Sequence, residues 1–148
     1  MALSVAAGTE TLQALSFGDA DATQDLIVGA VHHIYTVLST FVYSISIGTA
    51  GDTFQLAIVG HDHHAGADTN ASIMVIAKVV SVAGQTFIFN DKFSFNGVEP
   101  TGTNVLSASE QIAIAAQSGS AVQEIKFSVS DAVDDFDVLV TYLDQDWT

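Results

Sequence analysis

The stretch from Phe41 to Ile47 reads FVYSISI, and its strict alternation decides the fold class. One face takes the odd-numbered apolar residues from Phe41 to Ile47, and the other takes Val42 and two serines. A period of two is the signature of an extended strand, because successive side chains point to opposite sides of a sheet. The pattern therefore predicts an antiparallel strand with one wet face.

The residues that follow extend this pattern. A glycine-containing loop, Gly48–Asp52, separates the first strand from a second over Thr53–Val59, and this loop length is typical of a hairpin. The second strand has large apolar residues at alternate positions from Phe54 to Ile58. Ser72–Val82 is apolar on both faces except for Lys78, which predicts a central strand covered on both sides.

Two Phe-x-Phe pairs surround Asn90–Lys92. If these three residues form an odd-length hairpin loop, Phe89 lies opposite Phe93 and Phe87 lies opposite Phe95, so all four rings share one face. A two-residue loop would divide the rings between the faces. We expect the odd loop, because one core then gains all four rings.

The remaining segments complete an all-β chain. Strands are expected over Val122–Val129 and Phe136–Leu143, joined by the acidic loop Asp131–Asp135. Ser107–Ala116 is ambiguous, since Ser107 and Glu110 fit a helix capping box while the following residues alternate; we favour a strand. Short strands separated by turns predict an antiparallel two-sheet sandwich of jelly-roll type.

The first 25 residues differ from the rest, and we expect two parts: an extended N-terminal arm over 1–25 and a β-sandwich domain over 26–148. The arm should contain one short strand near Thr11–Phe17. A frayed terminus is the alternative interpretation. The start of the chain lacks the basic region and long apolar stretch of a signal peptide, and no apolar run has the roughly 18 residues of a membrane-spanning helix.

Charge restricts the partners. The 148 residues include 17 acidic residues, three lysines and no arginine, for a formal net charge of -14. Phosphate backbones are bound largely through Lys and Arg, so nucleic acid is a poor partner, and so is an anionic membrane. The absence of cysteine excludes disulfides, thiolate zinc sites and thiol nucleophiles.

The sharpest cluster of chemistry-bearing residues is Gly60-His-Asp-His-His64. His61, His63 and His64 could hold zinc, nickel or iron, and Asp68 follows closely. The pattern invites comparison with cupins, metal-binding jelly rolls with a His-x-His pair followed by Glu. It departs from them, because the expected glycine is Gln55, the acidic residue is Asp68, and the later histidine position is Val105. A solvated loop tip is the favoured interpretation, with no cofactor.

Other candidate sites are weaker. Calcium could bind oxygen ligands in the acidic loop region, but the EF-hand pattern is absent and a solvated loop is favoured; the residues concerned are Asp131, Asp134, Asp135 and Asp137. His32 and His33 are neighbours on an expected strand, so their side chains should point to opposite faces. The sequence contains neither a nucleophile elbow nor a glycine-rich phosphate loop followed by Lys, and we expect a protein that is not an enzyme.

Three segments resemble the head decoration (cement) proteins of tailed bacteriophages: Ala2–Leu12, Ser46–Phe54 and Val140–Trp147. The resemblance implies a homotrimer on the outer capsid surface of a virion, with the major capsid protein as partner. It also implies that the N-terminal arm contacts the capsid; the contact residues would be Ala2, Leu3, Val5 and Leu12.

Two other functions remain open. One is a receptor- or glycan-binding module of a phage fibre or cell surface, which needs an exposed aromatic platform; the candidates are Tyr35, Tyr43, Tyr142 and Trp147. The other is a cupin-like metal-dependent enzyme, which needs the histidine cluster of residues 61–64 inside the sandwich.

Overall fold

The computed structural model describes residues 9–61, 71–98 and 122–146, and these form nine strands. Their bounds are β1 Glu10–Phe17, β2 Gln24–Val28, β3 His33–Ser46, β4 Thr53–His61, β5 Ala71–Val80, β6 Thr86–Phe89, β7 Phe93–Asn96, β8 Glu124–Val129 and β9 Asp135–Asp146. The predicted all-β fold is confirmed. The ambiguous segment Ser107–Ala116 lies outside the described residues.

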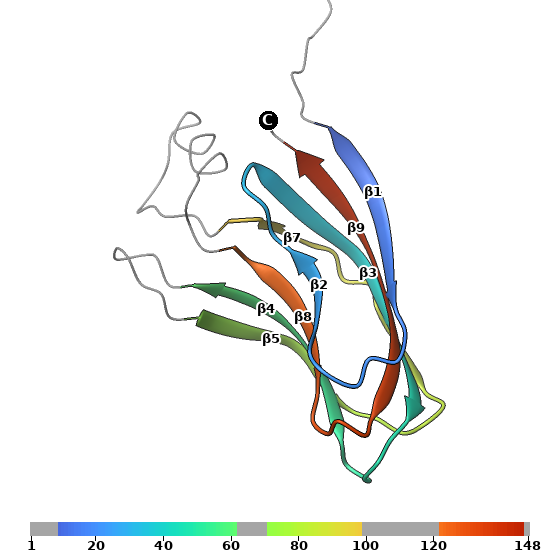
Figure 1. Cartoon of the computed structure of the whole chain (residues 1–148). Coiled ribbons are helices and arrows are strands. Elements are labelled where there is room, and N and C mark those ends of the chain that lie inside the picture. Colours follow the sequence, from blue (N-terminus) through green and yellow to red (C-terminus); the bar gives the residue numbers. More distant parts are fainter. Residues whose placement is uncertain (1–8, 62–70, 99–121, 147–148) are drawn as a thin grey trace, which may run out of the picture.

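The strands make two layers that face each other (Figure 1). Sheet A has the order β1-β9-β3-β6, with β7 also paired to β3, and sheet B has the order β2-β8-β4-β5. When β6 and β7 are counted as one interrupted strand, the pairing is nested. The outermost strands β1 and β9 pair, then β2 with β8, then β3 with β6–β7, and innermost β4 with β5. This nested antiparallel pairing is a jelly roll, as the sequence predicted.

The nesting changes the expected role of the loop Gly48–Asp52. It was expected to close a hairpin, but β3 lies in sheet A and β4 in sheet B. The loop therefore carries the chain from one sheet to the other. Strands that follow each other in a jelly roll mostly lie in opposite sheets, which local alternation in the sequence does not reveal.

Strand β3 changes face along its length. Tyr35 and Val37 point into the core; a register shift against β9 between Val37 and Ser39 then inserts one extra residue. A bulge of this kind reverses the alternation, so Val42 and Ser44 are fully buried downstream. The aromatic face of the FVYSISI stretch consequently lies on the outside of sheet A.

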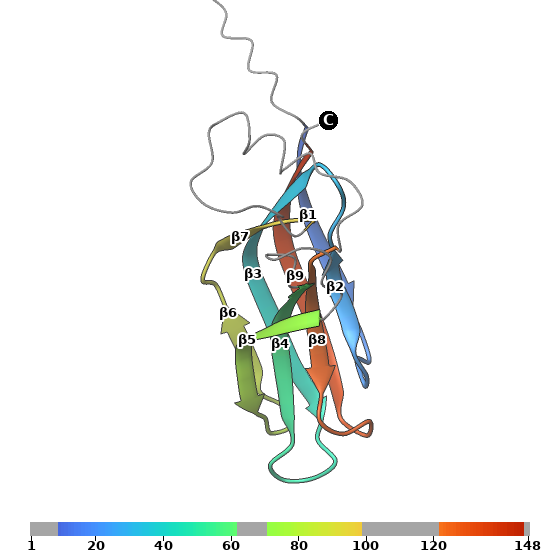
Figure 2. The ribbon, with the colours of Figure 1, turned by 90° about the vertical axis from the view of Figure 1, so that its left-hand side faces the viewer.

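Strands β6 and β7 do not form the expected hairpin. Both pair antiparallel with β3, so they run in the same direction, one after the other, on the same side of β3 (Figure 2). The expectation about the rings nevertheless holds, because all four phenylalanines pack against the core. The three intervening residues place Phe89 and Phe93 on the same face whether the chain turns back or continues straight, so the predicted face was right and the predicted turn was wrong.

Strand β5 is not the central, doubly covered strand that its apolar sequence predicted. It lies at the edge of sheet B and pairs with β4 alone among the described strands. Its inner-facing Ala77 and Val79 pack against the core, while Ile73 and Met74 are 61% and 68% exposed. A long apolar run fits a buried strand and an interface strand equally well, and only the strand order separates them.

The core between the sheets is aromatic. Phe54 of β4 stacks on Phe127 of β8, with ring centroids 5.7 Å apart, and both make edge-on contacts with Phe136 of β9. All three rings have no exposed surface. Edge-to-face and offset packing of this kind adds to the stabilisation that burial of the rings provides.

The first strands belong to the sandwich. The strand expected near Thr11–Phe17 is present as β1, and it pairs with β9 over eight consecutive residues. Strand β2 pairs with β8 in the other sheet, so residues 10–28 contribute to both layers. The described part of the expected 1–25 arm is thus integrated into the fold, and residues 1–8 lie outside the described residues.

Candidate interaction surface

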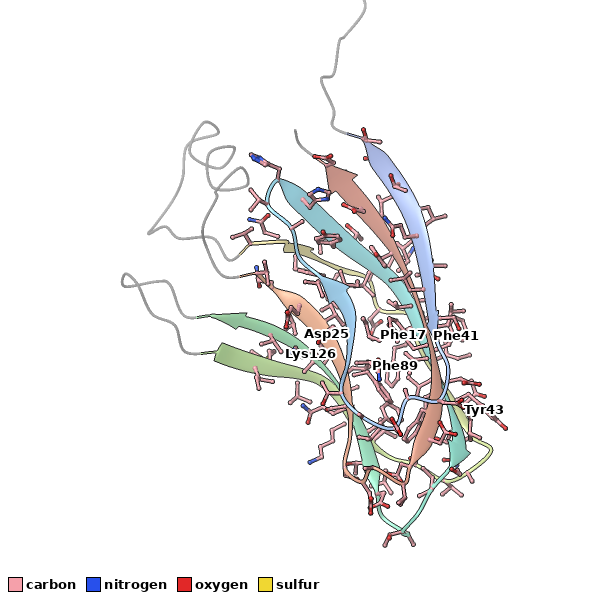
Figure 3. All side chains as sticks on the ribbon, in the orientation of Figure 1. Phe17, Asp25, Phe41, Tyr43, Phe89 and Lys126 are labelled. Atoms are coloured by element: carbon pink, nitrogen blue, oxygen red, sulfur yellow. The ribbon has the colours of Figure 1, made fainter. Side chains whose placement is uncertain are left out.

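The outer face of sheet A carries an apolar patch. We call it the sheet A patch and define it by five side chains that are 36% to 59% exposed: Phe41, Tyr43, Ile45, Ile88 and Leu139. Phe41 occupies the centre, because it is the direct cross-strand partner of both Leu139 and Ile88. Figure 3 shows Phe41 and Tyr43 on the side of sheet A turned away from sheet B, whereas Phe17 and Phe89 lie between the sheets.

The bulge in β3 creates this patch. Without it, the aromatic residues of the FVYSISI stretch would continue the inner face set by Tyr35 and Val37. The sequence offered no local signal for the bulge, since no glycine or proline lies between Val37 and Phe41. Contiguous exposed apolar side chains are typical of protein–protein contact sites.

A second apolar surface follows the β5 edge of sheet B, where no further described strand pairs. We call it the β5 strip and define it by its exposed apolar side chains: Ile73, Met74, Val75, Ile76 and Val80. Next to the strip, between β5 and the β6–β7 edge, lies an apolar slot of about 160 Å³. Residues from both sheets line the slot, including Val37, Leu56, Ile76 and Phe93.

The outer face of sheet B is different in kind. Lys126 of β8 places its Nζ 3.0 Å from Glu124 Oε2 and 3.2 Å from Asp25 Oδ1 of β2. The hydrogen bond from Lys126 to Glu124, followed by the one to Asp25, raises the pKa of the lysine. This triad, labelled in part in Figure 3, links β2 to β8 through charge rather than through apolar contact.

A polar cluster lies where β3 begins and β9 ends. His33 Nδ1 is 2.7 Å from Asp144 Oδ1, and the His33 ring stacks on Tyr35, which stacks in turn on Phe95. Burial, with a smaller effect of the Asp144 charge, raises the pKa of Tyr35 to about 12. Both partners of the His–Asp pair are more than three-quarters buried, so the pair fastens β3 to β9. His32 does not lie on the strand as expected; it occupies the preceding turn with a φ of 67°.

Carboxylates gather where the chain passes between the sheets. Asp134 is fully buried, and its Oδ1 accepts a 2.8 Å hydrogen bond from the Gly48 backbone N–H. Burial, with smaller effects of Asp52 and Asp131, raises the pKa of Asp134. Among the described residues, no group of three or more His, Asp or Glu side chains is arranged to hold a metal ion.

The predicted metal and capsid residues are only partly described. His61 ends β4, while His63 and His64 lie outside the described residues. Of the proposed capsid contacts, Leu12 lies on β1 with its side chain 66% exposed. The other three, Ala2, Leu3 and Val5, lie outside the described residues.

Two of the four aromatic residues that could form a glycan-binding platform are not accessible. Tyr35 and Tyr142 are buried, and the Tyr142 hydroxyl donates a hydrogen bond to Gln13. Tyr43 is exposed and sits beside Phe41 in the sheet A patch. Trp147 lies outside the described residues.

No family model matches the sequence, and no curated protein matches it. Among solved structures, one similar chain comes from Bacillus endospore appendages, described as disulfide-linked pili: identity is 8% and the TM-score 0.37, over 95% of this chain and 88% of that one. Another comes from infectious bursal disease virus, strain Gx: identity is 10% and the TM-score 0.39, over 96% of this chain and 38% of that one. Sequence identities and TM-scores this low show neither a shared family nor a shared function.

Across the described ranges, no helix is long and apolar enough to cross a membrane.

Proposed function

We propose that this chain is a non-catalytic structural protein of a virion, a decoration protein that binds the outer surface of a capsid and stabilises the head. The observation that carries the proposal is the sheet A patch. A small jelly roll with a tightly packed aromatic core leaves a row of large apolar side chains, centred on Phe41, exposed on one face. Such a face is costly in water and is stabilised when a second surface covers it.

The expected energy favours repeated contacts. A patch of ~300 Å² buried at ~25 cal/mol per Å² contributes about 7 kcal/mol. Association costs roughly 4–15 kcal/mol in lost translational and rotational freedom. One patch alone therefore gives weak binding, and stable attachment needs several linked contacts, as an oligomer on a repeating lattice provides. The homotrimer and the capsid contacts implied by the phage resemblance would meet this need.

The acidic character of the chain agrees with a role outside a capsid. With a formal net charge of -14, the chain is repelled by packaged nucleic acid. Its partner surface would be the apolar or basic exterior of a capsid protein. We therefore place the protein on the outer surface, with neither nucleic acid nor membrane as a partner.

The experiment is a count of copies. Particles from the source are purified, and this chain is quantified against the major capsid protein by mass spectrometry. A ratio near one to one supports the decoration function, and absence from particles overturns it. Particles reconstituted with Phe41→Ser protein should lose the chain at lower ionic and thermal stress than particles with wild-type protein.

One observation favours a second function, a receptor- or glycan-binding module. Tyr43 and Phe41 form an exposed aromatic pair, and sugar rings stack on such surfaces. A presence of only a few dozen copies per particle, together with glycan binding that Tyr43→Ala abolishes, would support this function over the first.

A further inference from the structure

We propose that the outer edge of β5, which no described strand other than β4 pairs with, pairs antiparallel with the β5 edge of a second copy of this chain, so that two four-stranded sheets become one eight-stranded sheet. The surface concerned is the β5 strip, which is separate from the sheet A patch. The inference does not depend on a capsid partner, because it concerns the isolated protein.

The edges of the two sheets differ in how well they are protected. β2, the other edge of sheet B, has five residues, a register shift between Asp25 and Ile27, and a salt bridge from Asp25 to Lys126. The β6–β7 edge of sheet A is broken by Asn90–Lys92. Short length, bulges and charges are the devices that keep edges from pairing with other chains. β1, the remaining edge, has eight residues in continuous register with β9 and two exposed large apolar side chains. β5 is the longest edge strand, with ten residues and a single charge, Lys78. It has one register shift against β4, at Ile76, but it exposes five large apolar side chains, more than any other edge.

The β5 strip is apolar on both faces. Met74 lies opposite Ile58 on the inner side of the sheet, while Ile73 and Val75 lie opposite Val59 and Ala57 on the outer side. All three β5 side chains are about half exposed or more. A strand added alongside β5 would satisfy its outward main-chain groups and cover apolar side chains on both faces at once. An unpaired edge that is long and apolar is otherwise prone to aggregation.

Charge identifies the occupant as a second copy. Two copies with a net charge of -14 each repel one another over most of their surfaces. The chain has no acidic residue between Asp68 and Asp91, a run that includes the whole of β5. Two β5 strands therefore meet with no carboxylate of their own opposite each other, and the acidic residue beside the contact is Asp91, which lines the slot with Ile76 and Ala77. A basic partner would be drawn to the acidic ends of the molecule rather than to a strand whose only charge is Lys78.

The pairing has a defined symmetry. Antiparallel contact of a strand with itself requires a two-fold axis through the middle of β5, near Ile76. The inner-facing side chains of the second copy would then lie over the mouth of the slot that Ile76 and Ala77 help to line. The expected particle is a dimer of twice the 15.5 kDa chain mass. This differs from the trimer that the phage resemblance implies, so the mass in solution separates the two.

The first test is sedimentation velocity of the full chain over a range of concentrations. Wild type should be a dimer, and Val75→Lys should dissociate it, with affinity reduced at least about tenfold, since the two lysines at position 75 then lie diagonally across the axis and repel each other. Leu12→Lys is the matched control, an equally exposed apolar residue on the β1 edge, and it should leave the dimer intact. Circular dichroism confirms that each variant is folded. A monomeric wild type, or a Val75→Lys protein that still dimerises like wild type, overturns the proposal.

A second test locates the contact. Because the chain has no cysteine, Ile76→Cys provides a single attachment site for a spin label. Labels at position 76 should show strong dipolar broadening between copies, whereas labels on a Leu12→Cys control should not. Broadening absent at position 76 in a confirmed dimer would place the interface elsewhere and overturn the β5 assignment.

Hydrogen exchange distinguishes a second copy from other possible occupants of the β5 edge. In the dimer, the amides of Ile73–Val80 that point away from β4 should exchange slowly in wild type and fast in Val75→Lys. Slow exchange in a monomeric wild type would mean that another part of the same chain covers β5. Fast exchange in a monomeric wild type would leave the edge to a different protein. Either result contradicts pairing with a second copy.

Discussion

The two faces of sheet A show how little side-chain hydrophobicity alone decides burial. On β3, the inner face after the bulge consists of Thr40, Val42 and Ser44, all buried, while the outer face presents Phe41 and Tyr43 to solvent. The less apolar set is inside because the register with β9 places it there. The two faces should therefore respond differently to mutation.

The largest difference is expected between two phenylalanines on the two faces. Phe136→Ala removes a fully buried ring that contacts Phe54 and Phe127, and should lower the free energy of unfolding by about 3–5 kcal/mol. Phe41→Ala removes a partly exposed ring and should cost less than about 1 kcal/mol. Urea denaturation measures both. Equal losses would mean that the outer face is buried in the isolated protein and would break the comparison.

The next effect compares the melting temperatures of variants at a buried aspartate, Asp134, and at an exposed one, Asp137. Asp134 is buried and its pKa is raised chiefly by burial, whereas Asp137 is exposed on the outer face. Asp134→Asn keeps an oxygen that accepts the Gly48 N–H and removes the buried charge, so the melting temperature at neutral pH should rise by about 2–4 °C. Asp137→Asn, the control, should change it less.

The pH dependence of Asp134 has a definite sign. A carboxyl whose pKa is raised in the folded state binds its proton more tightly there than in the unfolded chain. Its contribution to stability is complete below the ordinary Asp pKa and is lost as the pH rises through the raised value. The advantage of Asp134→Asn should therefore shrink as the pH is lowered through that range in thermal unfolding. An advantage that is constant with pH would show that ionisation of Asp134 is not its cause.

A smaller effect is expected at two serines of β3. Ser44 is fully buried, and its Oγ has no hydrogen-bond partner among the described residues, while Ser46 is exposed. Ser44→Ala removes the unsatisfied hydroxyl and should stabilise the protein by about 1 kcal/mol. Ser46→Ala should be close to neutral. Destabilisation by Ser44→Ala would reveal a partner for the hydroxyl, such as a bound water.

The smallest effect tests the outer face of sheet B. Lys126→Met removes both ion pairs of the triad, and because these charges are partly solvated, the loss should be about 0–1 kcal/mol and should diminish further in high salt. Comparison of unfolding at low and high salt measures it. A loss several times larger would mean that charge holds β2 in place as firmly as apolar packing holds the core.

Several features could be predicted from the sequence because they depend only on whether residues of a strand are an even or an odd number of positions apart. The strands around Phe41, Phe54 and Phe136 follow from alternation, and the four rings from Phe87 to Phe95 share a face because their spacing is even. The all-β class and the jelly-roll type follow from many short strands with few helix-favouring segments. The strong acidity, and with it the poor fit to nucleic acid, is set by composition.

The candidate surfaces could not be predicted, because they depend on long-range register and strand order. A single bulge after Val37 decides that Phe41 is outside, and nothing in the local sequence marks it. The apolar run of β5 reads as a buried strand, and only its position at the end of the β2-β8-β4-β5 order makes it an edge. Alternation tells which side chains share a face. Which face is covered, and by what, is decided only when distant strands pair.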